Sequence, residues 1–188
     1  SVRTVFWGTH ATVRPDDYLI DDGTILIRRE PDLTGLELCR ALRRGATSFQ
    51  DVPGVSWRAQ KQSFHAPDRP FIEDLDSLPF PSQTAMGIGK YVATDIHRPF
   101  ALVKTSRGCP HQCVFCTAHA FHGDRWRTRS PQRILDEIEQ IRKETGITDF
   151  FLQSDVFSKS KAWTTELCEG FLNRGLKVDW FCNSRVDS

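Results

Sequence analysis

The stretch TSRGCPHQCVFC, residues 105–116, holds three of the six cysteines of this chain within eight residues of one another. They are Cys109, Cys113 and Cys116, in the pattern C-x3-C-x2-C. A chain of 188 residues is long enough to bury a hydrophobic core without a disulfide or a metal. The crowding of thiols in one short segment therefore needs an explanation other than stabilisation of the fold.

The composition limits the roles that these clustered thiols can have. Apolar residues make up 39% of the chain and charged residues 26%, and the net charge of +1 provides no broad attraction for nucleic acid or anionic membranes. The sequence lacks the eighteen or so consecutive apolar residues of a membrane helix, and its start lacks a secretory pattern. We therefore expect a cytoplasmic protein with a small-molecule substrate, no nucleic acid partner and no membrane span. Cytoplasmic thiols stay reduced, which favours a metal-binding or catalytic role for the clustered cysteines.

The segments around the cysteine loop predict two successive βαβ units. Three short apolar runs are expected to be strands, and they lie at residues 100–105, 149–153 and 178–183. Between them, helices are expected over residues 130–146 and 160–175. Such crossovers imply parallel strands with helices outside, in an open sheet or part of a barrel. Ligands of these folds bind at the carboxyl ends of the strands, which is where the cysteine loop begins.

The two predicted helices have clear ends and inner faces. Ser130 is a suitable N-cap with Pro131 in the first turn, and Gly146 and Gly175 mark the two ends. The residues expected to face inward recur at helical spacing, and they are Ile134, Ile138, Ile141, Trp163, Leu167 and Phe171.

The first part of the chain also has an α/β pattern. Strands are expected at residues 4–7, 24–27 and 55–58, with one helix that is capped by Asp32 and ends at Gly45. The apolar face of this helix is expected to contain Leu33, Leu36, Cys39 and Leu42. Prolines crowd the segment that follows, so we predict a domain over 1–59, a Pro-rich linker over 60–97 and a second domain over 98–188.

The spacing of the three cysteines suits a particular metal chemistry. Three thiolates from one loop can bind three corners of a cubane iron–sulfur cluster and leave the fourth iron open to a substrate or cofactor. Two alternatives remain from the spacing alone. A structural zinc site could recruit His119 or His122 as its fourth ligand, or the thiols could be unligated.

The same stretch resembles the signature loop of the radical S-adenosylmethionine superfamily. Arg107 and Gly108 before the first cysteine and Phe115 before the last one also match that loop. The resemblance implies a 4Fe-4S cluster bound by the three cysteines, inside a TIM-like barrel. It further implies that S-adenosylmethionine binds the open iron and is cleaved reductively to a 5′-deoxyadenosyl radical, which requires a reductant such as flavodoxin or ferredoxin.

The resemblance also implies where the cofactor is contacted. Phe115 is expected near its adenine, with core packing as the alternative. Ser154 and Asp155 follow the second strand, where related enzymes place polar or acidic groups toward the cofactor. Asn183 and Arg185 follow the third strand and are expected at the same edge, although a surface salt bridge is the alternative for Arg185.

Some further residues are expected to be structural. Arg125, Arg127 and Arg129 alternate along the chain, and we expect a solvated face rather than a clamp for an anionic group. The remaining cysteines lie in apolar patterns and are expected to be buried packing residues, and they are Cys39, Cys168 and Cys182.

The segment HGDRWRTRSPQRILDEIE, residues 122–139, is similar to one branch of that superfamily, which includes anaerobic magnesium-protoporphyrin monomethyl ester cyclase-like and hopanoid-associated proteins. This branch carries a cobalamin-binding Rossmann-like domain before the barrel, and TVFWGTHAT resembles its last part. The branch usually has Gly-Gly and Gly-Glu where this chain has Trp7-Gly8 and Arg29-Glu30. Gly8, Thr9 and His10 are the residues expected on the cobalamin side, although a hydrogen-bonded loop histidine is the preferred interpretation of His10.

Taken together, these patterns predict an α/β chain with the C-terminal part of a Rossmann-like cobalamin-binding domain, followed by the first half of a partial (β/α)6 TIM-like barrel. Residues from 96 onward suffice for about three βα units of the six expected, so the chain is predicted to be an internal fragment. The predicted reaction is cobalamin-linked methyl transfer or oxidative cyclisation. The alternative is a non-enzymatic α/β module that binds zinc or a cluster. No residue is assigned a catalytic role.

Overall fold

The computed structural model describes residues 3–93 and 97–187. The chain forms two compact units, one from Ser1–Glu73 with Cys109–Asp124, the other from Asp74–Gly108 with Arg125–Ser188. The first unit thus includes residues 60–73, which were expected in the linker, and the cysteine loop, which was expected in the second domain.

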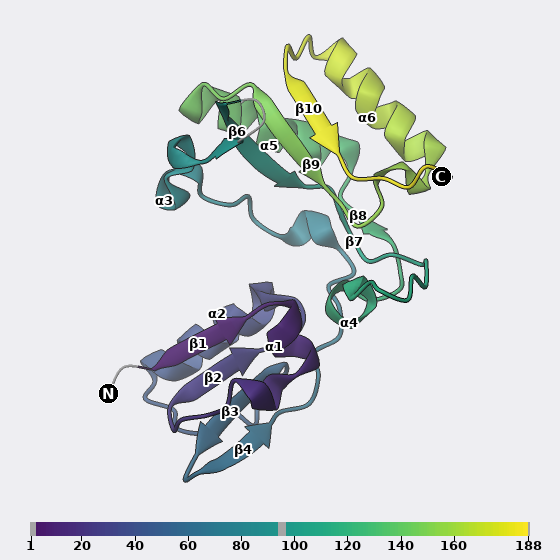
Figure 1. The fold of residues 1–188 in the computed structure, drawn as a ribbon. Helices are drawn as coiled ribbons and strands as arrows, with labels where there is room; N and C mark the ends of the chain where they lie inside the picture. Colours follow the sequence, from purple (N-terminus) through teal and green to yellow (C-terminus); the bar gives the residue numbers. More distant parts are fainter. Residues whose placement is uncertain (1–2, 94–96, 188) are drawn as a thin grey trace. The chain divides into compact units, whose positions relative to one another are not determined.

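The first unit is built on a mixed sheet of four strands. These are β1 (Thr4–Trp7), β2 (Thr24–Ile27), β3 (Val55–Ala59) and β4 (Gln62–His65), which lie side by side in that order (Figure 1). β1 and β2 are parallel, whereas β2–β3 and β3–β4 are antiparallel. The first three strands follow the sequence prediction. β4 was not predicted because its sequence QSFH is largely polar, which an exposed edge strand tolerates.

Helix α2 (Pro31–Arg43) corrects the predicted apolar face. Leu33 and Leu36 are exposed, and the buried positions are Thr34, Leu38 and Ala41. Thr34 can be buried because its hydroxyl donates a hydrogen bond to the carbonyl oxygen of Pro53 at 3.1 Å. The helix also begins at Pro31 rather than after Asp32, because proline suits the first helical position.

The core of the first unit lies between α2 and the sheet. Its buried residues come from the two central strands, from α2, from the loop before β3 and from the residue after β4, and they are Ile25, Ile27, Leu38, Ala41, Phe49, Val52, Val55, Trp57 and Ala66. Leu26 points away from this cluster, because neighbouring residues of a strand face opposite sides, and packs with Ala11 and Leu19. Ala11 belongs to the short helix α1 (Thr9–Val13), so both faces of β2 are covered.

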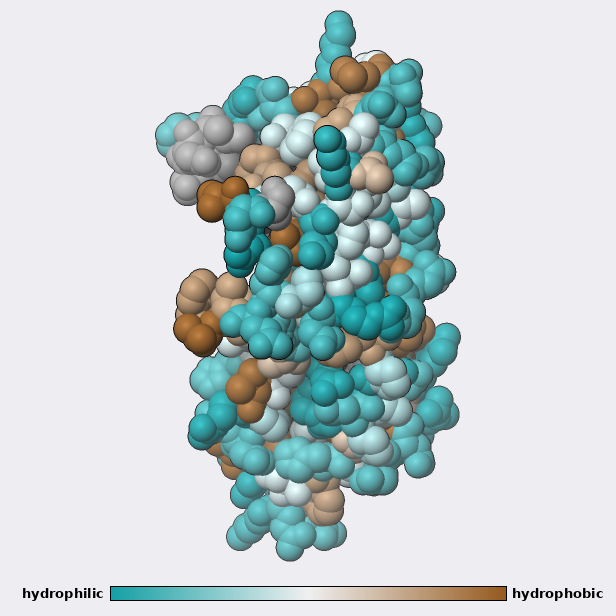
Figure 2. Space-filling model, turned by 90° about the vertical axis from the view of Figure 1, so that its right-hand side faces the viewer, coloured by the Kyte–Doolittle hydropathy of each residue, from teal (hydrophilic) through white to brown (hydrophobic). Residues whose placement is uncertain are grey.

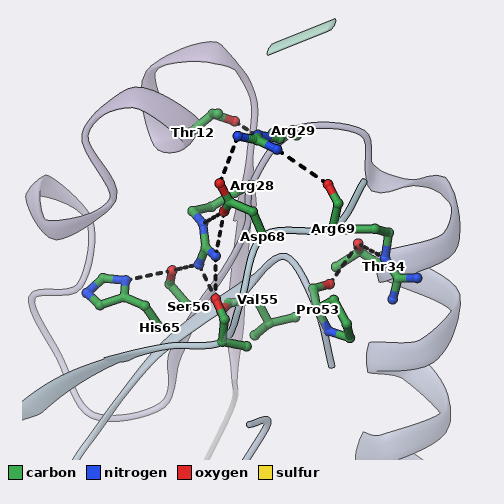
Figure 3. Close-up of polar contacts among 11 residues, drawn as sticks. Thr12, Arg28, Arg29, Thr34, Pro53, Val55, Ser56, His65, Asp68 and Arg69 are labelled. Atoms are coloured by element: carbon green, nitrogen blue, oxygen red, sulfur yellow. Dashed lines mark hydrogen bonds and ion pairs between the residues drawn. The ribbon is translucent and has the colours of Figure 1, made fainter. Parts of the chain in front are cut away.

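A buried arginine ties this sheet to the chain that leaves it (Figure 3). The guanidinium of Arg28 donates hydrogen bonds to the carbonyl oxygens of Val55 at 2.9 Å and Ala66 at 2.6 Å. It also donates to a carboxylate oxygen of Asp68 at 2.9 Å and contacts the Ser56 hydroxyl. The segment after β4 is therefore part of the first unit, because its backbone and one acid satisfy a buried charge.

The second unit contains the predicted parallel strands. β6 (Arg98–Lys104), β9 (Asp149–Gln153) and β10 (Asp179–Cys182) are parallel neighbours in chain order (Figure 1). The short strand β5 (Val92–Ala93) pairs antiparallel with β6. Helices α5 (Pro131–Thr145) and α6 (Lys161–Asn173) make the two crossovers. Both predicted βαβ units are therefore confirmed. A short helix, α3 (Gln83–Met86), precedes β5.

The helices pack on one face of this sheet. The alternating strand residues Ala101, Val103, Phe150 and Leu152 meet the inner faces of both helices in one cluster. The predicted inward residues Ile134, Ile138, Ile141, Leu167 and Phe171 all belong to that cluster, and Trp163 packs against it while partly buried. The Ser130 hydroxyl accepts a hydrogen bond from the Arg133 N–H, and Gly146 adopts the left-handed conformation after α5, as predicted.

Two arginines after the cysteine loop correct the prediction of a solvated face. Arg127 is 5% exposed and Arg129 8% exposed, whereas Arg125 lies at the surface. Arg129 forms an ion pair with the buried Glu137 of α5 and donates to the Lys104 carbonyl oxygen at 3.1 Å. The acid that permits this burial lies on the following helix, so the alternating arginine pattern alone did not indicate it.

The surface carries apolar residues in scattered positions. The face drawn in Figure 2 is mainly hydrophilic, with apolar residues in small separate patches. None of the helices formed by the described residues is both long and apolar enough to cross a membrane.

Candidate functional site

The cysteine loop leaves the carboxyl end of β6, as predicted. β6 is followed by β7 (Ser106–Arg107), which pairs antiparallel with β8 (Arg127–Thr128). This short ladder brings the two ends of segment 108–126 together. Segment 108–126 is thus a loop with paired ends. It follows the end of the first parallel strand, at the edge where such sheets bind ligands.

A backbone hydrogen bond joins two residues further inside this loop. The backbone N–H of Cys109 donates to the carbonyl oxygen of Gly123 at 3.2 Å. Gly123 follows the short helix α4 (Ala118–His122), and its own N–H donates to the carbonyl oxygen of His119 at 3.0 Å. The three cysteines therefore lie in a loop that begins at Cys109, and Cys109 is hydrogen-bonded to Gly123, the residue directly after α4.

The entry to the loop is held by an acid at the end of the neighbouring strand. A carboxylate oxygen of Asp155, two residues after β9, accepts a hydrogen bond from the N–H of Gly108 at 2.8 Å. A hydrogen bond to a charged acceptor is stronger than one between neutral groups. Asp155 was predicted to contact S-adenosylmethionine, and the structure shows it engaged with the backbone directly before Cys109.

The three thiols differ in exposure. Cys109 is 8% exposed, Cys113 is half-buried and Cys116 is exposed. The Cys116 N–H donates to the Cys113 carbonyl oxygen at 3.0 Å, so these two cysteines share a turn. Within residues 3–93 and 97–187, no group of three His, Cys, Asp or Glu side chains is gathered closely enough to hold a metal. The donor set itself, three thiols in one irregular segment, fits a 4Fe-4S cluster.

Two histidine nitrogens in the same segment are buried. Nε2 of His111 and Nε2 of His119 are shielded from solvent and have no hydrogen-bond partner among the described residues. His119 is one of the two fourth ligands considered for zinc, and His122, the other, lies at the end of α4 with its ring 4.7 Å from that of Phe121. The segment that contains the thiols therefore also contains buried nitrogen donors.

The other three cysteines are not part of this site. Cys39 is exposed on α2, which corrects the prediction that it is buried. Cys168 and Cys182 are half-buried, as packing residues can be. Burial raises the pKa of the Cys182 thiol, and the nearby Cys168 raises it further. Cys182 therefore stays protonated near neutral pH and is a poor metal ligand, because metals bind the thiolate.

The residues predicted to contact S-adenosylmethionine are in different surroundings. Ser154 is 5% exposed, and its hydroxyl oxygen has no hydrogen-bond partner among the described residues. Phe115 is 87% exposed, so the alternative of core packing is wrong for the described chain. Asn183 is exposed, and its carbonyl oxygen accepts from the Phe157 N–H at 3.2 Å. Arg185 forms a two-point ion pair with Asp187 at 2.8 and 2.6 Å, which is the predicted salt-bridge alternative.

The residues expected on the cobalamin side begin α1. Gly8 has φ +134°, in the region that favours glycine, and a side chain there would meet no atom within 4 Å. Thr9 is the first residue of α1, and Nε2 of His10 lies 3.2 Å from a carboxylate oxygen of Asp17. His10 is thus hydrogen-bonded, but within α1 and not in a loop as expected. This hydrogen bond lowers the pKa of Asp17 below its ordinary value.

The structure brings this region and the cysteine loop together within the first unit. Helices α1 and α4 are in contact, and the rings of Trp7 and Phe121 lie 6.1 Å apart. The sequence analysis did not find this contact, nor the roles of Phe121 and Gly123. A glycine directly after a short helical pattern was the only local signal for Gly123.

Comparisons with known proteins show what the chain is similar to. Residues 103–185 match the model of the Radical SAM superfamily. An uncharacterized methyltransferase of Pyrococcus horikoshii is 32% identical over the whole chain, which spans 41% of that relative. An anaerobic magnesium-protoporphyrin IX monomethyl ester cyclase of Rubrivivax gelatinosus is 30% identical over 98% of the chain, which spans 34% of it.

The fold of the chain also resembles a solved structure. This is the cobalamin-dependent S-adenosylmethionine radical enzyme OxsB, with a TM-score of 0.71 at 19% identity over 94% of this chain and 25% of that protein. The chain thus spans about two-fifths or less of the length of each of these three proteins. Residues 103–185 thus match the radical SAM superfamily, and the relatives of the chain include methyltransferases and magnesium-protoporphyrin cyclases.

Proposed function

We propose that this chain is the cluster-holding part of a radical S-adenosylmethionine enzyme of the cobalamin-linked type. The observation that carries the proposal is the position of the cysteine loop at the carboxyl end of β6, the first strand of a parallel sheet wound in chain order. Three thiols at the ligand-binding edge of such a sheet suit a cluster with one iron free to bind a cofactor.

In this proposal five residues have a role in binding the cluster or the cofactor. Cys109, Cys113 and Cys116 bind three irons as thiolates, and Asp155 orients the loop by holding the Gly108 N–H. A reduced cluster bound by these thiolates would supply one electron for the cleavage of S-adenosylmethionine to methionine and a 5′-deoxyadenosyl radical. Ser154 offers the cofactor a hydroxyl, because a buried hydroxyl without a partner is unfavourable until a polar group reaches it.

The remaining predicted contacts fall into two groups in this proposal. Phe115 is exposed and available to the adenine, whereas Arg185 would first have to leave Asp187. Gly8, Thr9 and His10 face the corrin, with Gly8 allowing a close approach of the backbone.

We further propose the larger architecture predicted from the sequence. β1–β4 with α1 and α2 form the C-terminal part of a Rossmann-like cobalamin-binding domain. β6, β9 and β10 with α5 and α6 form the first half of a partial (β/α)6 barrel. The reaction is methyl transfer or oxidative cyclisation of a small molecule, which agrees with the names of the relatives, and flavodoxin or ferredoxin serves as reductant.

A direct test is the cleavage of S-adenosylmethionine by the anaerobically reconstituted full-length protein with dithionite as reductant. We expect 5′-deoxyadenosine to form, to disappear in Cys113→Ala and to persist in the control Cys39→Ala, whose thiol lies on α2. Failure of the fully reconstituted protein to cleave S-adenosylmethionine would contradict the proposal.

A structural zinc site is the second candidate, and the buried Nε2 of His119 favours it. Three thiolates and one imidazole make a common closed zinc site. Zinc at one equivalent without acid-labile sulfide, lost in both Cys113→Ala and His119→Ala, would establish this candidate instead.

A further inference from the structure

Gly123 lies against the ring of Phe71, a residue of the segment that follows the first sheet. A Cβ atom added to Gly123 would lie 2.7 Å from Cε2 and 3.0 Å from Cδ2 of that ring. Such distances are shorter than side chains tolerate, and Gly123 also has φ +81°, which favours glycine. Two independent features thus require glycine at the position that closes the cysteine loop.

Contacts with Glu30 and Arg29 hold Phe71 and its neighbour Ile72 in place. The next residue, Ile72, donates its N–H to a carboxylate oxygen of Glu30 at 2.8 Å, and Glu30 is 4% exposed. The guanidinium carbon of Arg29 lies 5.0 Å from the centre of the Phe71 ring. A ring with a fixed backbone and a cation on it has little freedom to move away from Gly123.

These contacts form a continuous path to the first cluster ligand. It runs from Glu30 through Ile72 and Phe71 to Gly123, whose carbonyl oxygen accepts from the Cys109 N–H. We propose that the contact between Phe71 and Gly123 acts as a clamp on the neck of the cysteine loop, where the neck is the hydrogen bond between Cys109 and Gly123. The clamp thereby positions Cys109. Phe71 and Gly123 act as positioning residues, and the proposal rests on the proposed function only where it concerns the cluster.

The test uses the cluster-free full-length protein, so that the clamp is measured independently of iron. The rate at which iodoacetamide alkylates Cys109 is followed by peptide mass spectrometry, with the exposed Cys116 as internal reference. We expect alkylation of Cys109 to be about tenfold faster in Gly123→Ala, because a strained backbone and a clash open the neck more often. The matched control is Gly146→Ala, which has a similar φ of +75° and open space around it, and should change the rate less than about twofold.

A second variant keeps the test valid if Gly123→Ala does not fold. Phe71→Ala introduces no clash, and we expect it to raise the alkylation rate of Cys109 about fivefold. The double variant should react no faster than Gly123→Ala alone, because both substitutions break the same contact. Wild-type rates in both single variants, or rate increases that multiply in the double variant, would overturn the clamp.

Iron content after anaerobic reconstitution distinguishes failure of the proposed clamp from failure of the proposed cluster-binding function. We expect Gly123→Ala and Phe71→Ala to retain about half the iron of the wild type or less. Absence of a cluster from the wild-type protein, with the alkylation pattern intact, would contradict the proposed function and leave the clamp standing. Full iron content in variants with fast Cys109 alkylation would show that the clamp does not position the ligand.

Discussion

Arg28 is a single residue on which much of the first unit depends. Its side chain is only 9% exposed, and it donates hydrogen bonds to two backbone carbonyl oxygens as well as to Asp68 (Figure 3). Removal of a buried charge leaves its acceptors unsatisfied, which costs more than the hydrogen bonds contribute.

We predict that Arg28→Ala lowers the free energy of unfolding by about 3 kcal/mol. Arg14→Ala is the control, because Arg14 is 68% exposed and its ion pair, among the described residues, is with the nearby Asp17. That substitution should change stability by about 0.5 kcal/mol or less. Urea unfolding followed by circular dichroism measures both, and equal midpoints for the two variants would contradict the prediction.

Asp155 is proposed to orient the cysteine loop by holding the Gly108 N–H, and two variants test this role. Asp155→Ala removes the acceptor of the Gly108 N–H, whereas Asp155→Asn keeps an oxygen acceptor without the charge. We predict that hydrogen exchange of the Gly108 amide in cluster-free protein is about tenfold faster in the alanine variant and close to wild type in the asparagine variant. Unchanged exchange in Asp155→Ala would mean that this acid does not hold the loop.

At the scale of whole elements, helices α5 and α6 approach closely at a glycine. A Cβ atom on Gly170 of α6 would clash with Cδ1 of Leu135, a buried residue of α5. Glycine normally weakens a helix by about 1 kcal/mol relative to alanine. The close approach of the two helices accounts for its presence here.

We predict that Gly170→Ala destabilises the protein by about 1 to 2 kcal/mol, because overpacking outweighs the gain in helix propensity. The matched control is Gly35→Ala in the interior of α2, where a Cβ would meet only Cδ1 of Ile27 at an ordinary 3.7 Å. That substitution should stabilise the protein by up to about 1 kcal/mol. Thermal unfolding of both variants is the measurement, and stabilisation by both would show that α5 leaves room at Gly170.

Elements with strong periodicity and clear ends were predicted correctly from the sequence. α5 has isoleucines at helical spacing, a serine cap and a final glycine, and both its bounds and its buried face match the structure. The buried face of α2 was not predictable from its leucines, because Thr34 and Ala41 allow the close contact and Leu33 and Leu36 remain exposed. The pattern of hydrophobic residues alone does not show which small side chains, or which polar side chains with a hydrogen-bond partner, face a sheet.

The candidate site was predictable where chemistry lies in local spacing. The three cysteines and their place after β6 followed from one short motif and one strand. The contacts that support the loop come from residues far apart in the chain, such as Asp155 with Gly108 and Phe71 with Gly123. No sequence pattern specifies such pairs, because tertiary packing brings them together.

At the scale of the whole molecule, the chain passes from one unit to the other at residues 73–74, 108–109 and 124–125. The cysteine loop is packed with the first unit, while the strands that lead into and out of it belong to the second. Neither unit is therefore a continuous segment of the chain.

The central claim is that this loop binds a 4Fe-4S cluster, and metal analysis tests it most directly. Iron, acid-labile sulfide and zinc would be measured in anaerobically reconstituted full-length protein, in Cys113→Ala and in the control Cys39→Ala. We predict about four irons and four sulfides in the wild type and in Cys39→Ala, and their loss in Cys113→Ala. Zinc without sulfide, or iron that persists in Cys113→Ala, would contradict the account.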